Sequence, residues 1–140
     1  VQLSTAGYSV AAAAFAVDFN DAELGFDATD ANNDGMPDGV SLHVPSGLLA
    51  TAAYNAAESR IEIVVAGLTL PFPLLSDGTV ATVTLAVKDG VSITESKVVL
   101  SNSSLGDNEG QTVPLSMTDG AVRIVTQPAN RVLLPLIRLQ

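Results

Sequence analysis

The chain lacks cysteine and tryptophan and contains a single histidine among its 140 residues. Without cysteine it can form no disulfide, no thiolate metal site and no thiol nucleophile. A single histidine leaves little room for imidazole acid–base chemistry or for the commonest transition-metal sites. These absences disfavour most enzyme classes and favour a binding or structural module.

Basic residues are also scarce, because six lysines and arginines stand against 15 acids, for a formal net charge of −9. Binding to nucleic acid requires lysine and arginine to displace the counterions of the phosphates, and an anionic membrane surface attracts the same positive charge. We therefore expect no nucleic-acid partner. No apolar run approaches the roughly 20 residues of a bilayer span, so we also expect no membrane insertion.

What the chain does contain is enough apolar material for one folded domain. Hydrophobic residues make up 47% of the sequence and charged residues 15%, a composition that excludes disorder. No secretion leader precedes Val1, so we expect a mature or trimmed form. The absence of cysteine is compatible with the cytosol and with a bacterial exterior.

Turn-forming residues recur about every 8–12 residues, the spacing typical of an all-β sandwich or barrel. Residues 11–19 alternate, with one side formed by Ala11, Ala13, Phe15, Val17 and Phe19 and the other by Ala12, Ala14, Ala16 and Asp18. Alanine favours helix, but large side chains at a spacing of two favour a strand. We expect about nine or ten strands in one antiparallel β-sandwich, at residues 1–4, 11–19, 24–26, 40–44, 48–54, 60–66, 79–87, 97–100, 113–118 and 121–125.

Two apolar segments do not fit this strand pattern. Residues 68–77 contain Pro71 and Pro73, which exclude a central strand because proline has no N–H donor. We expect a cover over one end of the core, with an exposed recognition patch as the alternative. Residues 126–140 carry two arginines, no acid and many leucines and isoleucines. Two interpretations are open. In the first, these residues form an extra edge strand or a tail docked on the acidic body. In the second, they form a sorting or tethering tail.

The strongest chemical pattern lies between residues 30 and 38. Oxygen-bearing side chains fall at positions one, three, five and nine of an EF-hand-type calcium loop, and Gly35 falls at position six. Ca²⁺ takes six to eight oxygen ligands at about 2.3–2.6 Å, and alternate residues of a tightly curled loop can point at one ion. The predicted ligands are Asp30, Asn32, Asp34, the Met36 carbonyl and Asp38.

The match to the calcium loop is incomplete. Position twelve, where a bidentate glutamate is expected, is Ser41, so a ligand must come from elsewhere and Asp27 is the nearest candidate. A predicted strand follows the loop in place of an EF-hand helix. Seven of the 15 acids lie between Asp18 and Asp38, and no base precedes Arg60. A cation would relieve this repulsion, so we favour a structural Ca²⁺ over the alternative, a solvated turn rich in Asx residues.

No other residues form a recognisable catalytic set. His43 lies in a predicted strand, and no serine has a Ser–His–Asp context or a Gly-x-Ser-x-Gly elbow. Neighbouring carboxylates such as Asp18 and Asp21 are explained by turn formation. We therefore expect no enzyme activity. The absence of tryptophan removes the aromatic platform common in sugar-binding sites, which weakens direct carbohydrate binding.

Four segments of the sequence follow one another in a characteristic order. They are residues 1–3, 10–26, 75–87 and 99–124, and they include DFNDAELGF at 18–26 and DGAVRI at 119–124. In this order they resemble a cohesin domain, the bacterial extracellular module that receives dockerins. The resemblance covers residues 1–125 and leaves residues 126–140 as a separate apolar, basic tail.

The resemblance implies a nine-stranded β-sandwich of jelly-roll topology, related to a class of carbohydrate-binding modules, in a secreted or cell-surface protein. It also implies a partner face made from one sheet, which here could include Ala12, Ala14 and Ala16; packing under the C-terminal tail is the alternative. The 30–38 loop is not a standard cohesin element and is similar to calcium repeats of thrombospondin type 3 segments and dockerins. We expect a scaffolding module for a dockerin-type protein partner, with a polysaccharide-binding module as the alternative.

Overall fold

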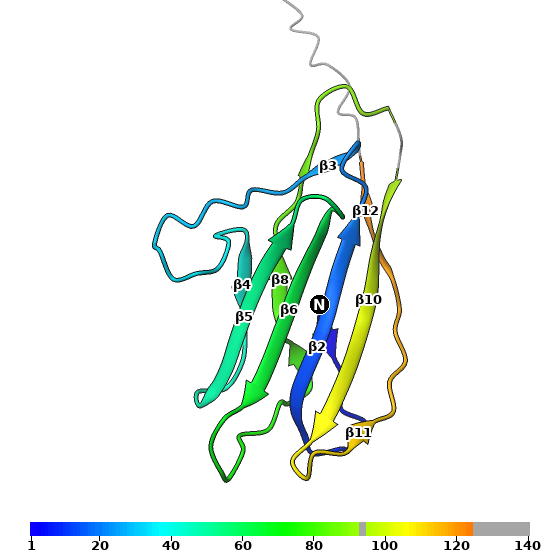
Figure 1. Cartoon of the computed structure of the whole chain (residues 1–140). Helices are drawn as coiled ribbons and strands as arrows, with labels where there is room; N and C mark the ends of the chain where they lie inside the picture. Colours follow the sequence, from blue (N-terminus) through cyan, green and yellow to red (C-terminus); the bar gives the residue numbers. More distant parts are fainter. Residues whose placement is uncertain (93–94, 125–140) are drawn as a thin grey trace, which may run out of the picture.

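A computed structural model describes residues 1–92 and 95–124 of the chain. These ranges contain no helix and twelve strand segments, which form two layers (Figure 1). The predicted all-β sandwich is therefore confirmed, and the alternative of a helix in the alanine-rich segment is excluded. Within the same ranges, no helix is long and apolar enough to cross a bilayer.

One layer is a single antiparallel sheet of six strands. The strand order is β11–β10–β2–β6–β5, and β12 also pairs with β10. The strands are β2 (Val10–Phe19), β5 (Leu48–Asn55), β6 (Arg60–Gly67), β10 (Glu95–Asp107), β11 (Thr112–Val113) and β12 (Gly120–Arg123). The predicted alternation of residues 11–19 thus forms the central strand, β2, which has β6 on one side and β10 on the other.

The other layer consists of three short strand pairs. They are β1 (Gln2–Leu3) with β7 (Gly78–Thr79), β3 (Leu24–Gly25) with β9 (Ala86–Val87), and β4 (Val40–Leu42) with β8 (Ala81–Val83). The single strand predicted at 79–87 is therefore wrong, because it is divided into three pieces. Each piece pairs with a different strand from the first third of the chain, so the segment bends between partners.

The core lies between the two layers and is built from alternate residues of the long strands. Ile61, Ile63 and Val65 of β6 are fully buried, and so is Leu24 of β3. Burying a side chain of this size stabilises the fold by about 1.5–3 kcal/mol. Residues of β2 and β6 that point into the core alternate with residues that point away from it. The other face of the six-stranded sheet therefore points toward solvent.

The other differences from the predicted strands concern the last third of the chain. Strand β10 continues well beyond the predicted end at residue 100, through an irregularity near Asn102, whose φ is 47°. The sequence Ser-Asn-Ser-Ser did not indicate this continuation of the strand, because serine and asparagine are typical of turns. Conversely, the strand predicted at 113–118 stops at Val113, and Pro114 follows it with no N–H donor. The predicted tail at 126–140 and its boundary lie outside the described residues.

The proline-containing segment 68–77 covers one end of the core, as predicted, and also exposes apolar side chains. Leu75 is buried, and its N–H donates to the Val10 carbonyl at 2.8 Å, so this part covers one end of the core. Phe72 packs so closely on Gly67 that a Cβ there would lie 2.7 Å from the ring. Leu68 and Leu70 remain strongly exposed, which leaves an apolar patch at the same end of the molecule.

Candidate functional site

The outer face is the side of strands β5, β6, β2 and β10 that points away from the core. Ala12, Ala14 and Ala16 lie on it, because the residues between them on β2 pack inward. Ala12 and Ala14 are half-buried, whereas Ala16 is only 1% exposed and lies beneath the surface of the outer face. The three alanines therefore share one sheet face, as the sequence predicts, and two of them are accessible.

On the β10 side, the residues beside these alanines are also small. Gly106, Ser104 and Ser101 of β10 lie opposite Ala12, Ala14 and Ala16, respectively. On the other side Ala66 of β6 lies opposite Ala12. Small residues of β2 and β10 thus form a shallow strip on the outer face, and Val64 and Glu62 of β6, which lie opposite Ala14 and Ala16, border it on the other side.

One end of the outer face is apolar. Val64 of β6 lies opposite Ala14, and Leu49 of β5 lies opposite Ala66, so both point outward. Their exposed fractions are 46% for Val64 and 55% for Leu49. Strand β6 ends at Gly67, so the exposed Leu68 and Leu70 continue the apolar character beyond this end of the sheet. Exposed apolar residues that gather in one place mark interaction surfaces more often than scattered ones do.

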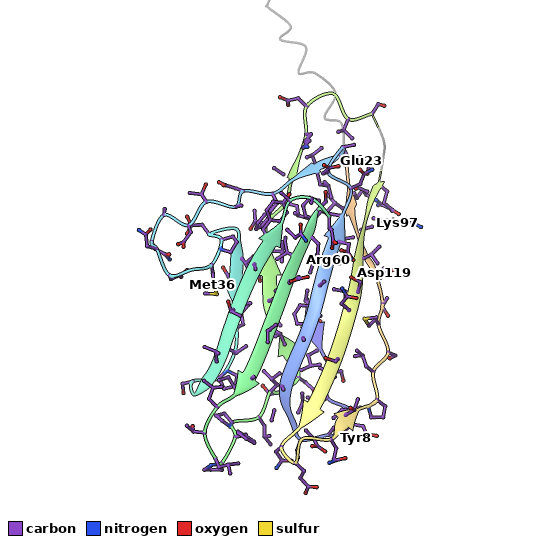
Figure 2. The ribbon with its side chains drawn as sticks, viewed as in Figure 1. Tyr8, Glu23, Met36, Arg60, Lys97 and Asp119 are labelled. Atoms are coloured by element: carbon purple, nitrogen blue, oxygen red, sulfur yellow. The ribbon has the colours of Figure 1, made fainter. Side chains whose placement is uncertain are left out.

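The opposite end of the outer face is charged and is organised around Asp18 and Arg60. These residues lie directly opposite each other on β2 and β6, and Arg60 Nε donates to Asp18 Oδ1 at 2.6 Å. The Ser101 hydroxyl donates to the second oxygen of Asp18, and Arg60 also pairs with Glu58. Figure 2 shows Arg60 and Lys97 at this end of the sheet. Both side chains of the central pair are 24% exposed, so the pair is partly shielded from water.

The environment of Asp18 keeps its carboxylate ionised. Burial on its own would raise the pKa of Asp18, but the hydrogen bonds from Ser101 and Arg60 and the positive charge of Arg60 together outweigh it and lower the pKa. The interpretation of Asp18 as a turn former was wrong, because it lies inside β2. The alternation predicted for residues 11–19, which places Asp18 on the same side as Ala12, Ala14 and Ala16, is confirmed.

The 30–38 loop projects from the sandwich between β3 and β4 (Figure 1). Its base is closed by the Asp38 N–H, which donates to the Thr29 carbonyl at 2.7 Å. Beside it, a Cβ on Gly39 would lie 2.7 Å from the ring of Phe26, so this close approach requires glycine. Phe26 in turn packs against Tyr54 with ring centroids 5.0 Å apart. The loop is therefore anchored to the core at its base.

The side-chain oxygens in the first half of the loop point to its interior. Asp30 accepts hydrogen bonds from the N–H groups of Asp34 at 3.1 Å and Gly35 at 2.9 Å, one on each carboxylate oxygen. The Asn32 Oδ1 accepts from the Asp34 N–H at 3.0 Å. The positive φ of Gly35, 85°, turns the chain sharply at this point. The side chains of Asp30 and Asn32, positions one and three of the predicted ligand set, thus point toward the same turn of the backbone.

The second half of the loop continues this arrangement. Asp34 Oδ1 accepts from the Met36 N–H at 2.9 Å, and Asp38 Oδ2 accepts from the Ala31 N–H at 3.0 Å. In residues 1–92 and 95–124, no three carboxylate, imidazole or thiol side chains form a group that could hold a metal ion. A cation in the loop would therefore need the Asn32 oxygen and the Met36 carbonyl in addition to the carboxylates, which would turn from the N–H groups toward the ion.

Asp27, the additional ligand predicted from the sequence, bonds to Thr29 through one carboxylate oxygen. Its Oδ1 accepts from the N–H and the hydroxyl of Thr29, at 3.0 and 2.5 Å. These two bonds lower the pKa of Asp27. His43 approaches Thr82, with 3.0 Å between Nε2 and Oγ1. Tyr54 lies between Phe19 and Phe26, so its ring belongs to the packed interior and offers no platform for a sugar.

The fold can be compared with those of known proteins. No protein-family model matches the chain, and no curated protein matches it. Among solved structures, the crystal structure of a complex between a CaDoc0917 variant and CaCohA2 matches with a TM-score of 0.70 at 12% identity, covering 89% of this chain and 86% of that chain. The chain has the cohesin fold. This confirms the predicted jelly-roll β-sandwich.

Two further cohesin structures support the same conclusion. The cohesin module from a family 33 glycoside hydrolase of Clostridium perfringens matches with a TM-score of 0.60 at 16% identity, covering 84% of this chain and 74% of that chain. The type I cohesin–dockerin complex Coh-OlpA–Doc918 from Clostridium thermocellum matches with a TM-score of 0.57 at 14% identity, covering 84% and 79%. At such low identity the cohesin likeness concerns the fold.

Proposed function

We propose that this chain is a non-catalytic binding module that receives a protein partner of the dockerin type on its outer face, outside the cell. The observation that carries the proposal is the open outer face itself, in a chain with the cohesin fold. Val64 and Leu49 are exposed on it, so no described segment covers the apolar end. If this face served internal packing, another element of the fold would cover these side chains.

The distribution of residues on the outer face suits a protein partner. Interfaces commonly combine an apolar centre that excludes water with a polar, charged rim. Here Val64 and Ala14 supply apolar area, and the ion pair of Asp18 with Arg60 supplies fixed charge at one end. Complementary charges steer the encounter and set the orientation of a partner. The scarcity of exposed aromatic rings does not favour a polysaccharide as the ligand.

The test is a binding titration of the chain against a panel of dockerin-bearing proteins, with Val64→Arg as the interface variant. Ser41→Arg is the matched control, because Ser41 is exposed on the opposite layer, on β4. We expect Val64→Arg to weaken binding by about 30-fold or more, the effect of losing a contact of about 2 kcal/mol. Ser41→Arg should bind like the unmodified chain. Absence of binding to every dockerin, or equal loss in both variants, would contradict the proposal.

We also propose that the 30–38 loop binds one structural Ca²⁺. The charged and amide side chains of the loop offer oxygen ligands, and hard Ca²⁺ prefers oxygen. Asp30, Asn32, Asp34, Asp38 and the Met36 carbonyl would hold the ion. When bound, the ion neutralises the repulsion among the three carboxylates and fixes a long connection between β3 and β4. The inward hydrogen bonds of Asp30 and Asn32 support this proposal, because a modest rotation would redirect the same oxygens to a cation.

A further inference from the structure

Strand β5 is the last strand on one side of the six-stranded sheet and has an open edge (Figure 1). Among the described residues its only strand partner is β6, so alternate residues of β5 direct their backbone N–H and C=O groups away from the sheet. The strand has eight residues. It is therefore about 26 Å long, at roughly 3.3 Å per residue. A row of unpaired backbone groups of this length is a template for a further strand.

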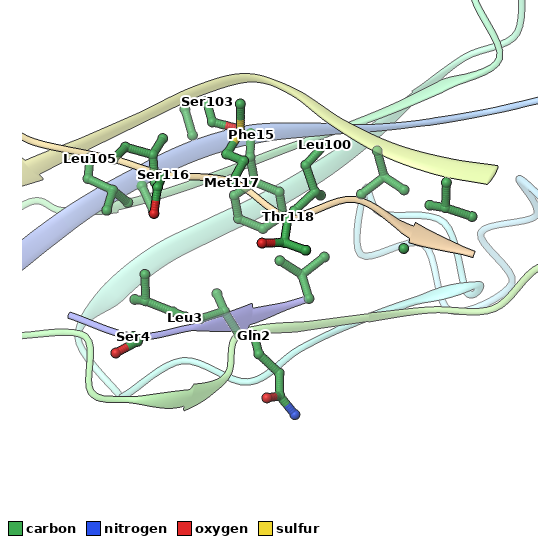
Figure 3. Close-up of a pocket in the computed structure, with 18 residues that line it drawn as sticks. Gln2, Leu3, Ser4, Phe15, Leu100, Ser103, Leu105, Ser116, Met117 and Thr118 are labelled. Carbon is green, nitrogen blue, oxygen red and sulfur yellow. The ribbon is translucent and has the colours of Figure 1, made fainter. Parts of the chain in front are cut away.

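The other edges of the described sandwich are shorter. On the far side of the same sheet, β11 and β12 have two and four residues, and Pro114 follows β11 with no N–H donor. Each strand of the other layer has two or three residues. Figure 3 shows an opening between the layers, about 540 Å³ in volume, with Gln2 and Leu3 on one side and Ser116 and Met117 on the other. The strand beside this opening, β1, offers only a two-residue edge, so β5 has the longest open edge of the described strands.

The sequence of β5 lacks the features that protect edge strands from pairing. Natural edge strands are commonly protected by lysine and other charged side chains, by proline or by a bulge. Residues 44–57 contain no charged residue, and residues 48–55 contain neither proline nor glycine. Leu49, which points outward beside this edge, is 55% exposed. In a chain with a net charge of −9, this neutral stretch is a place where a second copy can approach without a like charge directly opposite.

The strand is also complementary to itself. Antiparallel pairing about a two-fold axis at Thr51 places the two copies of Thr51 side by side and Leu49 of each copy beside Ala53 of the other, all on the outer face. Ala50 of each copy lies beside Ala52 of the other on the inward side. Thr–Thr and apolar cross-strand pairs are favourable in antiparallel sheets, and like charges directly opposite each other are not. A second copy of this chain therefore matches the edge on both faces of the sheet.

We propose that two copies of the chain associate through their β5 strands, paired antiparallel about a two-fold axis, so that the two six-stranded sheets form one continuous sheet. The pairing occupies the open edge of both copies, so the assembly closes at a dimer. This inference does not depend on the proposed protein partner, because the pairing takes place at the edge of the sheet and leaves both outer faces uncovered.

The test is sedimentation velocity of the full chain over a concentration series with no partner protein present. We expect a concentration-dependent dimer that becomes stronger with salt, because raising the ionic strength from about 0.01 M to about 0.15 M shortens the Debye length from about 30 Å to about 8 Å. This screens the repulsion between two bodies that each carry a net charge of −9. A chain that stays monomeric at every concentration and salt level would overturn the proposal. Species larger than a dimer would also overturn it, because they require another surface.

A charge at the centre of the edge should disrupt the dimer. Thr51 is exposed, and in Thr51→Lys the lysines of the two copies would lie side by side, so we expect dimerisation to weaken by about tenfold or more. Thr112→Lys is the matched control, because it makes the same change at an exposed position of β11, on the far side of the same sheet. The control should dimerise like the unmodified chain. Equal dimerisation by the two variants would refute pairing through β5.

Cross-linking locates the interface independently of affinity, because the chain contains no natural cysteine. Thr51→Cys should form a disulfide-linked dimer under mild oxidation, since facing residues of paired antiparallel strands lie within the distance that a disulfide spans. Thr112→Cys, equally a single exposed cysteine, should form it much more slowly. Equal rates for the two variants would show random collision and would refute the proposed pairing.

Discussion

The proposed calcium site makes a prediction whose size can be worked out. A ligand that binds only the folded state stabilises it by RT ln(1 + [L]/Kd), which is about 2.7 kcal/mol at 100 times Kd. For a domain of this length, 1 kcal/mol shifts the melting temperature by about 3–5 °C. Saturating Ca²⁺ should therefore raise the melting temperature by roughly 8–13 °C over a chelator-treated sample.

The structure indicates which substitution separates ion binding from loop structure. Asp30 accepts two backbone N–H bonds, so its removal would destabilise the loop with or without a cation. Asp34 accepts a backbone bond from Met36 through Oδ1 and an exposed side-chain bond from Asn32 Nδ2 through Oδ2. An asparagine oxygen can accept the backbone bond, so only the exposed side-chain bond is lost. Asp34→Asn should therefore leave the melting temperature in chelator nearly unchanged and should remove most of the response to Ca²⁺.

The assay is a thermal melt across a Ca²⁺ titration at matched ionic strength, because any salt screens a chain with a net charge of −9. Asp89→Asn is the control, since Asp89 is an exposed acid outside the loop. A melting temperature that does not change with Ca²⁺ would refute the site. An equal response in Asp34→Asn and the unmodified chain would show that the ion binds elsewhere.

Two predictions concern stability in the body of the sandwich. The pKa of Asp18 is lowered in the folded state, so its contribution is present above its unfolded pKa of about 3.9 and is lost as pH falls through the folded pKa. Urea unfolding at pH 6 and pH 3 should therefore show a smaller loss of stability for Asp18→Asn than for the unmodified chain, and equal losses would contradict this reasoning. Ile63→Ala removes a fully buried side chain and should cost about 2–5 kcal/mol in the same assay. Thr51→Ala, at an exposed position of β5, should cost less than about 0.5 kcal/mol, and a similar cost at both positions would argue against this core.

Features encoded over a few neighbouring residues were predictable from the sequence. The period of two in residues 11–19 identified β2, and it also separated the inward Phe15 and Val17 from the outward Ala12 and Ala14. The turn at residues 107–110 contains Asp, Asn and Gly, residue types typical of turns, and the Gly110 N–H donates there to the Asp107 carbonyl. The ligand pattern of the 30–38 loop is likewise contained in nine consecutive residues, and occupation by Ca²⁺ stays a prediction.

Features that depend on distant partners were decided by the tertiary structure. Asp18 meets Arg60 and Ser101 only because β6 and β10 pair on either side of β2, and those contacts join residues 42 and 83 positions apart. The division of residues 79–87 follows from three different partners. Alternation within a strand is a local property of the chain, whereas strand order and the openings between layers arise from long-range pairing that no short stretch of sequence contains.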